Sequence, residues 1–488
     1  MNKENIEKYI WNASNKLRGT IDAANYKDYL LTLLFWKYIS DLSLYVQEEK
    51  KTKTKNKRTQ DILTKNDIRY IEPELRLDHF AKNKYMDDIA KQLNDAMIKI
   101  ENNHELFRGT FQDVDFNSPK LGTSKERNRL IAELLEIFTS KELNFTHNIE
   151  GDVIGDIYQW LLGQFASSAG KKGGEFYTPS QVSKLLAILV KPESNNSIYD
   201  PTVGSGSLLI QAAKLVEGNN KDKMIDLYGQ EKNNQTVPLA KMTMIINNYL
   251  TAQIETGDTL TNPRFKDKNK LRQFDRVVAN PPFSAHIDIE ELKNGAFNER
   301  FKYGLPGKNQ GDWAFVQHMI ASLKDKGRLS VVLPIGPLFR SGSEGKIREQ
   351  VIKDGLVESV VLLPSSLFYG TSIGACILTV SKNNKAIRFI DASKLYKADK
   401  NQNVLENKHI DEIVNYLDKD KKNFSKLVKI NELEDYSLNV TTYTKEAEVE
   451  KLIDLSTLQK EILDLKKEID TKDKDLFALL KKEGIWKK

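Results

Sequence analysis

From about Gly173 onward, short apolar runs alternate with stretches of helical spacing, and many of the runs end at a polar residue or a glycine. Such alternation is typical of a parallel sheet with helices on its faces. The runs that we expect to form strands are Ile198–Asp200, Leu227–Glu231, Ile254–Asp258, Arg276–Ala279, Leu329–Leu333, Val357–Leu363 and Ile377–Val380. The sequence therefore predicts an α/β fold built on a doubly wound sheet.

With 488 residues, the chain is long enough for about three domains. Residues 1–150 carry apolar side chains near 3.6-residue spacing and predict a helical N-terminal domain, followed by the α/β domain over 151–400. Residues 401–488 are highly charged and predict a helical C-terminal region. Its end carries a heptad seam, broken once at Lys472, that predicts a helix packed on another in this chain or in a partner; the seam comprises Leu455, Leu458, Ile462, Leu465, Ile469, Leu476 and Leu479.

The composition narrows the class of protein without naming a partner. The formal charge of +6 allows nucleic acid but is too small to hold it by charge alone. The basic segment from Lys50 to Arg58 is more typical of a solvated loop than of phosphate contacts. A single cysteine, Cys376, excludes an internal disulfide and a thiolate cluster, and no apolar run approaches membrane-spanning length. We expect a cytoplasmic protein with no membrane partner.

A glycine-rich turn follows the first expected strand. It runs from Asp200 through Gly204, Ser205, Gly206 and Ser207 into a helical stretch. Glycines let the backbone approach a ligand closely, and the free amides at a helix start favour a negative group such as a carboxylate. Leu209 stands where the dinucleotide fingerprint has its third glycine, which disfavours a nicotinamide or flavin cofactor.

Two further acids, Glu231 and Asp258, end the next two expected strands. Ligands of open α/β sheets bind at the carboxyl ends of the strands, so both acids should face the same crevice as the glycine turn. One could bind ribose hydroxyls and the other a base amine. The alternative, in which each acid only caps the helix that follows it, stays open for either residue.

The motif Asn280-Pro281-Pro282-Phe283 comes directly after the apolar strand Arg276–Ala279. Two successive prolines fix the backbone and remove two amide donors, which leaves an acceptor-rich corner at a strand end. An exocyclic amine is a poor nucleophile because its lone pair is conjugated with the ring. Hydrogen bonds to the Asn280 side-chain oxygen and the Pro281 carbonyl would localise that lone pair, and Phe283 would stack on a base flipped out of the duplex.

Together, Asp-Pro-x-x-Gly-Ser-Gly and Asn-Pro-Pro-Phe resemble the amino-methyltransferase family. Further segments resemble the modification subunits of type I restriction-modification systems, namely Leu17-Arg18-Gly19, Tyr38-Ile39-Ser40-Asp41, Gly174-Glu175-Phe176-Tyr177-Thr178-Pro179-Ser180, Gly311-Asp312-Trp313-Ala314-Phe315, Val332-Leu333-Pro334 and Leu367-Phe368-Tyr369-Gly370-Thr371. The likeness extends from the N-terminus to about residue 390.

The resemblance implies an S-adenosylmethionine-dependent methyltransferase that modifies adenine N6 in DNA, with Asn280, Pro281, Pro282 and Phe283 as its catalytic corner. It implies cofactor contacts at Glu175, Phe176, Tyr177, Thr178, Pro179, Ser180, Asp200, Gly204, Ser205, Gly206, Ser207 and Glu231, with Asp258 near the cofactor adenine. Direct transfer from an activated sulfonium needs no metal. The alternatives are methylation of cytosine N4, RNA or a protein glutamine, or a non-catalytic scaffold.

Base readout needs a module that places several side chains in a groove, and no segment of the chain is left over for one. We therefore expect DNA recognition by a separate specificity subunit, reached partly through the C-terminal seam. The resemblance adds a restriction subunit and two modification subunits for each specificity subunit.

Overall fold

A computed structural model of the chain describes residues 3–18, 23–53, 60, 63–111, 114–145, 153–168, 177–218, 224–369, 371–399, 402–445 and 455–484. The chain divides into two compact units, Met1–Thr444 and Lys445–Lys488. Within the described ranges, no helix combines the length and the apolar character that crossing a membrane requires.

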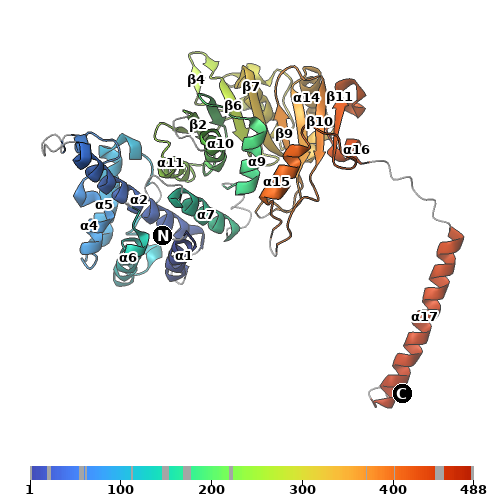
Figure 1. Cartoon of the computed structure of the whole chain (residues 1–488), viewed down its shortest axis with the longest axis horizontal. Coiled ribbons are helices and arrows are strands. Elements are labelled where there is room, and N and C mark those ends of the chain that lie inside the picture. Colours follow the sequence, from blue (N-terminus) through green and yellow to red (C-terminus); the bar gives the residue numbers. More distant parts are fainter. Residues whose placement is uncertain are drawn as a thin grey trace. The chain divides into compact units, whose positions relative to one another are not determined.

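The N-terminal helices share one hydrophobic core. They are α1 (Lys3–Arg18), α2 (Ala23–Lys53), α4 (Leu77–Lys82), α5 (Ile89–Asn103), α6 (Ser124–Phe138) and α7 (Val153–Ser168), and Figure 1 shows them grouped in blue to teal. Trp36 on α2 is fully buried in this core, as is Tyr158 on α7. Met242 and Ile245 of α11 (Val237–Ile246) join the same cluster, which fixes the helical part to the α/β part.

The strands form one large sheet and a small separate hairpin. They are β1 (Ser197–Asp200), β2 (Asp226–Glu231), β3 (Gln253–Thr256), β4 (Lys266–Asp267), β5 (Lys270–Leu271), β6 (Phe274–Ala279), β7 (Leu323–Pro334), β8 (Val357–Leu362), β9 (Ala375–Val380), β10 (Ala386–Asp391) and β11 (Ser425–Lys429). The hairpin is β4-β5, and the sheet has the order β11-β10-β8-β9-β7-β6-β1-β2-β3. Its neighbouring strands are parallel except at β9 and β11.

The order of the sheet reverses between β1 and β6, because the chain winds outward through β2 and β3 and then returns to the other side of β1. Such a switch point leaves a crevice at the carboxyl ends of the two strands. The loops that follow β1 and β6 both leave the sheet there, which brings the glycine turn and the Asn280 corner to one edge.

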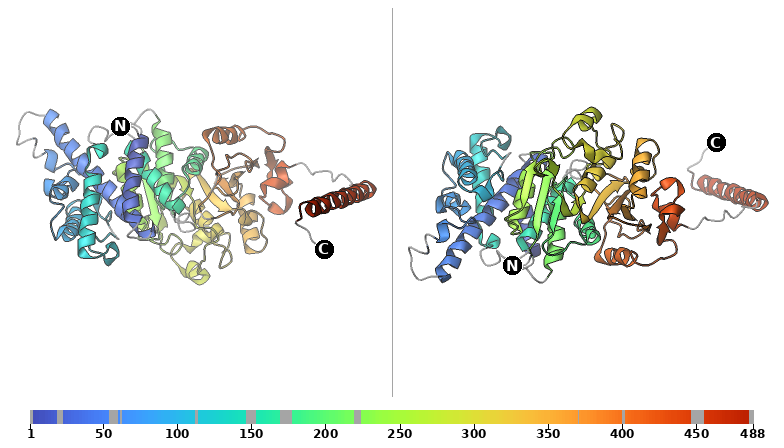
Figure 2. Two further views of the ribbon diagram at one scale, coloured as in Figure 1. Left: turned by 90° about the horizontal axis from the view of Figure 1, so that it is seen from below. Right: turned by 90° about the horizontal axis from the view of Figure 1, so that it is seen from above.

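Helices cover both faces of the sheet, because successive strand residues point to opposite sides. Val278 of β6 packs in one core with α9 (Ser180–Val190), α10 (Ser207–Glu217) and α15 (Asn407–Asn415). Val277 packs in the other core with α13 (Asp312–Ala321), α14 (Ser343–Lys353) and α16 (Val440–Thr444). Both views of Figure 2 show α14 and α15 on opposite sides of the strands. The short helix α12 (Ile289–Asn294) lies in the connection from β6 to β7.

The predicted doubly wound α/β sheet is confirmed, and each expected strand has an observed counterpart. The strand expected over Ile254–Asp258 ends earlier, at Thr256. Asp258 then lies in a turn, where its carboxylate accepts the backbone N–H of Leu260.

Strands β10 and β11 extend the sheet beyond the predicted set. The helical character expected for residues 401–488 is wrong over β11, which pairs antiparallel with β10. In β11, Ser425 and Val428 are the buried residues and the lysines are exposed, so the strand carries almost no apolar alternation. Charged residues of this kind are common on edge strands, where they discourage further pairing.

The second unit contains α17 (Leu455–Lys482), a single long helix as the heptad spacing predicts. Figure 1 shows it as one uninterrupted helix. The seam residues Leu458, Ile462, Leu465, Ile469, Leu476 and Leu479 are all exposed.

Candidate functional site

The glycine turn begins with Asp200, a fully buried acid at the end of β1. Its Oδ1 accepts the backbone N–H of Thr202 at 2.9 Å, whereas its buried Oδ2 has no hydrogen-bond partner among the described residues. Burial raises the pKa of Asp200 to about 8, and the charge of Glu231 adds to the shift. The turn therefore carries one buried carboxyl oxygen that is free to form a hydrogen bond with a ligand.

Gly206 has a φ of +83° and directly precedes α10. A Cβ atom at this position would lie 2.6 Å from Cε of Met244 on α11. The close approach that requires glycine is therefore to a neighbouring helix and not to the space beyond the turn. Gly206 still serves the site, because it lets the chain reverse so that α10 begins at Ser207 with its free amides at the crevice.

The hydroxyls of this turn differ in their contacts. Ser205 is buried, and within the described part of the chain its Oγ has no partner. Ser207 lies 3.5 Å from Ser183, oxygen to oxygen, which joins the first turns of α10 and α9. Ser205 is thus the hydroxyl available to a ligand of the turn.

Glu231 ends β2, and its carboxylate holds the glycine turn against that strand. Oε2 accepts the N–H of Gly204 at 3.0 Å, and Oε1 accepts the N–H of Asn233 at 2.8 Å. Burial raises the pKa of Glu231, and these backbone donors partly offset the rise. Since a carboxylate oxygen can accept a second hydrogen bond, the same group can still bind a hydroxyl pair.

Asp258 lies beside the glycine turn and is held by its own loop. Oδ1 accepts the N–H of Leu260 at 2.8 Å, and Oδ2 forms an ion pair with exposed Lys232 at 2.7 Å. The Thr259 hydroxyl donates to the Pro201 carbonyl at 2.5 Å, which links this loop to the turn after β1. The observed contacts are those of a turn-capping acid, and a contact with a cofactor adenine stays a prediction.

The segment Tyr177–Ser180 leads into α9 at the same edge, while the predicted site residues Glu175 and Phe176 lie outside the described residues. Tyr177 is buried, with its ring 6.0 Å from that of Tyr369. Pro179 caps α9, and the Ser180 hydroxyl donates to the Gln181 side chain at 3.0 Å.

Asn280, the first residue after β6, connects the catalytic corner to the segment Tyr177–Ser180. Its Nδ2 donates to Oγ1 of Thr178 at 3.0 Å. Its Oδ1 is buried and finds no donor within the described ranges. The side chain therefore presents an unused acceptor at the strand end, as the chemistry predicted for the corner requires.

The remaining residues of the corner differ in their exposure. Pro281 is buried and Pro282 is exposed. Phe283 is half-buried, and its ring meets that of Phe368 edge to face with the centroids 5.8 Å apart. Phe368 and Tyr369 thus reach the site from the loop between β8 and β9. Sequence reasoning noted that loop as a resemblance but placed neither residue at the site.

Asp312 is a second residue that sequence reasoning left out of the site. It begins α13, is fully buried, and accepts the N–H of Ser284 through Oδ1 at 3.1 Å. Ser284 has a positive φ of +51°, so this bond holds a strained turn directly after Phe283. The Gly311 N–H adds a bond to the Ala285 carbonyl at 3.1 Å. The Gly311–Phe315 motif was the available signal, and its effect is to fix the corner.

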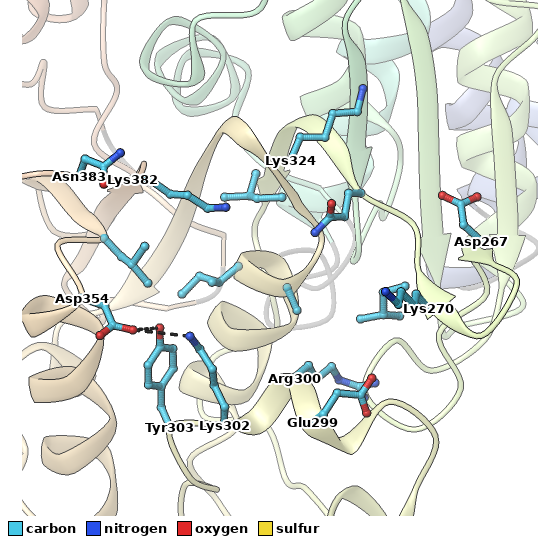
Figure 3. A pocket seen from close by; sticks show the side chains of 16 residues that line it. Asp267, Lys270, Glu299, Arg300, Lys302, Tyr303, Lys324, Asp354, Lys382 and Asn383 are labelled. Carbon is cyan, nitrogen blue, oxygen red and sulfur yellow. Dashed lines mark hydrogen bonds and ion pairs between the residues drawn. The ribbon is translucent and has the colours of Figure 1, made fainter.

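A large cavity of about 940 Å³ lies elsewhere, at the amino ends of β6, β7 and β8. Figure 3 shows basic and acidic side chains around it, including Lys302, Tyr303 and Asp354. Asp354 accepts the Tyr303 hydroxyl at 2.6 Å and pairs with Lys302 at 3.5 Å. This cavity is at the opposite edge of the sheet from the motifs, so its size does not make it the site.

Two protein-family models match the chain, and several known proteins are similar to it. The family described as N-6 DNA Methylase matches residues 149–452, and the HsdM N-terminal domain matches residues 6–138. The Type I restriction enzyme MpnII methylase subunit of Mycoplasma pneumoniae is 33% identical, over 98% of this chain and 97% of the relative. The MjaVIII methylase subunit of Methanocaldococcus jannaschii is 34% identical, over 89% and 77%.

Among solved structures, the chain is similar to a type I restriction-modification system methyltransferase subunit from Streptococcus thermophilus. The two align with a TM-score of 0.83 at 31% identity, covering 91% of this chain and all of the other. At this coverage the similarity includes both the helical N-terminal part and the α/β part.

Proposed function

This chain belongs to the family of type I restriction enzyme methylase subunits and N-6 DNA methylases, and we propose that its Asn280 corner methylates N6 of an adenine flipped out of DNA. The observation that carries the proposal is the buried Asn280 Oδ1, which the fold leaves without a partner at the end of β6. We propose S-adenosylmethionine as the methyl donor.

The described residues fit this cofactor. Asp200 Oδ2 and Ser205 Oγ are buried and lack partners in the described part of the chain, so both can bind polar groups of a ligand at the glycine turn. The amino end of α10 suits its carboxylate, and Glu231 suits its ribose hydroxyls. When bound, S-adenosylmethionine supplies a methyl group already activated by a positively charged sulfur. Roles for Glu175, Phe176, Asp258 and the remaining predicted contacts, except Thr178, stay part of the proposal.

The chain itself orients the target. Asn280 Oδ1 accepts one N–H of the adenine amine and the Pro281 carbonyl accepts the other, which turns the nitrogen lone pair toward the methyl donor. Phe283 offers a ring face to the base, and the ring of Phe368 packs against it at a steep angle. Asp312 keeps this loop in place through Ser284. No metal is part of the proposed mechanism.

The competing functions are not favoured. Methylation of RNA, cytosine N4 or protein glutamine would use the same corner, and a scaffold would need no corner at all. Membership in the type I methylase family extends over both the helical and the α/β parts, which argues for DNA and for adenine.

We further propose that the chain acts in a complex. A type I methylase subunit is expected to work with a specificity subunit that recognises the DNA sequence and with a restriction subunit. Two copies of this chain for each specificity subunit follow from the family resemblance. The exposed seam of α17 is our proposed contact with the specificity subunit.

Replacing Asn280 with alanine tests the proposed corner. We expect Asn280→Ala to lower single-turnover methyl transfer by about 100-fold or more, the scale of losing a group that acts only in the transition state. Calorimetric titration should show nearly unchanged affinity for S-adenosylmethionine, because Asn280 holds the target amine.

The matched control is His286→Ala in the same loop, where the exposed imidazole is hydrogen-bonded only to Asn309 among the contacts observed for it. It should keep wild-type transfer. Substantial turnover in Asn280→Ala, or an equal loss in His286→Ala, would show that Asn280 does not have the proposed role of holding the target amine.

A further inference from the structure

The side chain of Asn280 has two different ends, and only one of them can serve the proposed reaction. Oδ1 accepts a hydrogen bond and Nδ2 donates one. An adenine amine has two donors, so it needs the oxygen. A rotation of the amide by about half a turn would place the NH₂ group against the amine and make the corner repel its substrate.

In the structure the amide has the productive orientation, and a contact with Thr178 holds it there. Thr178 Oγ1 accepts from Asn280 Nδ2 at 3.0 Å, and this bond joins segments that are 102 residues apart in the sequence. The Thr178 side chain is buried, 6% exposed, so water does not readily replace it. With Nδ2 held by Thr178, the opposite end of the amide, Oδ1, is the buried atom without a partner.

We propose that Thr178 is a positioning residue: it holds the Asn280 amide so that Oδ1 faces the target amine. This inference rests on the proposed function. It changes the role expected from the resemblance, in which Thr178 is a cofactor contact. The chain would thereby couple its cofactor segment, Tyr177–Ser180, to its catalytic corner through one side-chain bond.

Two substitutions separate the parts of the threonine side chain. Thr178→Val keeps the branched shape and removes the hydroxyl, whereas Thr178→Ser keeps the hydroxyl and removes the methyl. We expect Thr178→Val to slow single-turnover methyl transfer about 10-fold, equivalent to about 1.4 kcal/mol. Thr178→Ser should stay within about 3-fold of wild type. Affinity for S-adenosylmethionine should change in neither variant.

Thr110→Val is the matched control, because Thr110 is a fully buried threonine whose hydroxyl donates to Phe107 in the helical part. It should keep wild-type transfer. Thr178→Ala, which removes hydroxyl and methyl together, provides a second hydroxyl-free variant if the valine variant does not fold. Melting temperatures of all variants show which of them are folded.

Three other results of these measurements would overturn the inference. Weaker cofactor binding with an unchanged transfer step would make Thr178 a cofactor ligand. A loss in Thr178→Ser as large as that in Thr178→Val would make its role one of packing. Full transfer in Thr178→Val would show that the bond is not needed. If wild-type protein with its specificity subunit does not methylate DNA, the proposed function fails before any variant is compared.

Discussion

At the residue scale, several buried side chains of the site use one polar atom to hold the fold and keep the other unpaired. Asp200 binds the Thr202 amide with Oδ1 while Oδ2 is without a partner in the described ranges. Asn280 donates to Thr178 through Nδ2, while its Oδ1 has no partner among the described residues. Unpaired buried groups are costly to the fold and are commonly found at functional sites.

Asp200 should make the stability of the chain depend on pH. Its folded-state pKa of about 8 lies above the value of about 3.9 for an unfolded aspartate, so the folded state binds the extra proton between these values. Stability should therefore fall as pH rises through this window, by at most about 1.4 kcal/mol per pH unit.

Asp200→Asn removes this titration without changing the shape of the side chain. Thermal unfolding of the two proteins without cofactor should be measured at pH 5, 6, 7 and 8. The stability of the variant relative to the wild type should increase as pH rises. If the stability of both proteins changes in parallel with pH, the pKa of the Asp200 carboxyl is not raised in the folded state.

We expect Gly206 to contribute to the stability of the fold even in the absence of a ligand. Gly206→Ala places a Cβ against Met244 and forces a left-handed conformation, so we expect the free energy of unfolding to fall by roughly 2–4 kcal/mol. Gly218→Ala is the control, because Gly218 also has a positive φ but open space around it.

Chemical denaturation of both glycine variants and the wild type measures the difference. Equal losses at the two positions would mean that contact with Met244 carries no cost. We expect the larger loss at Gly206, by about 1–3 kcal/mol.

At the scale of elements, hydrophobic pattern predicted the buried parallel strands because they are continuous apolar runs. The same reasoning missed β10, where Arg388 interrupts the run, and β11, where only two of the five residues are buried. In the basic segment from Lys50 to Arg58, three lysines form ion pairs with acidic side chains, namely Lys50, Lys51 and Lys53. Residues 54–58 of this segment lie outside the described residues.

The helix α17 provides the test of the proposed assembly. Ile462 and Ile469 lie in its exposed seam, at 47% and 58% exposure. Burying two such side chains against a partner contributes about 3–6 kcal/mol, so Ile462→Ser with Ile469→Ser should weaken binding of the specificity subunit more than 100-fold.

The control pair is Lys460→Ser with Lys467→Ser on the opposite side of the same helix, where charged side chains are exposed. Calorimetry or co-purification with the specificity subunit should show no effect of this pair. Unimpaired assembly of the isoleucine variant, or of a chain truncated before Lys451, would show that the seam is not the contact.

At the scale of the whole molecule, sequence motifs predicted that the glycine turn and the Asn280 corner share one edge, because parallel strands place their carboxyl ends together. The loop contacts were not predictable in the same way. Phe368 and Asp312 reach the corner from distant segments, and which side chain meets which depends on packing of the finished fold. The bond between Thr178 and Asn280 is of the same kind.

The central claim is that this chain, with a specificity subunit, methylates adenine N6 in DNA at the Asn280 corner. The direct measurement is mass spectrometry of nucleosides from unmethylated DNA after incubation with S-adenosylmethionine, using the chain alone, the chain with the specificity subunit, and Asn280→Ala in the same complex. The account predicts N6-methyladenine from the wild-type complex, very little from the chain alone, and essentially none from Asn280→Ala. N4-methylcytosine as the product, or N6-methyladenine from the Asn280→Ala complex at the wild-type level, would contradict it.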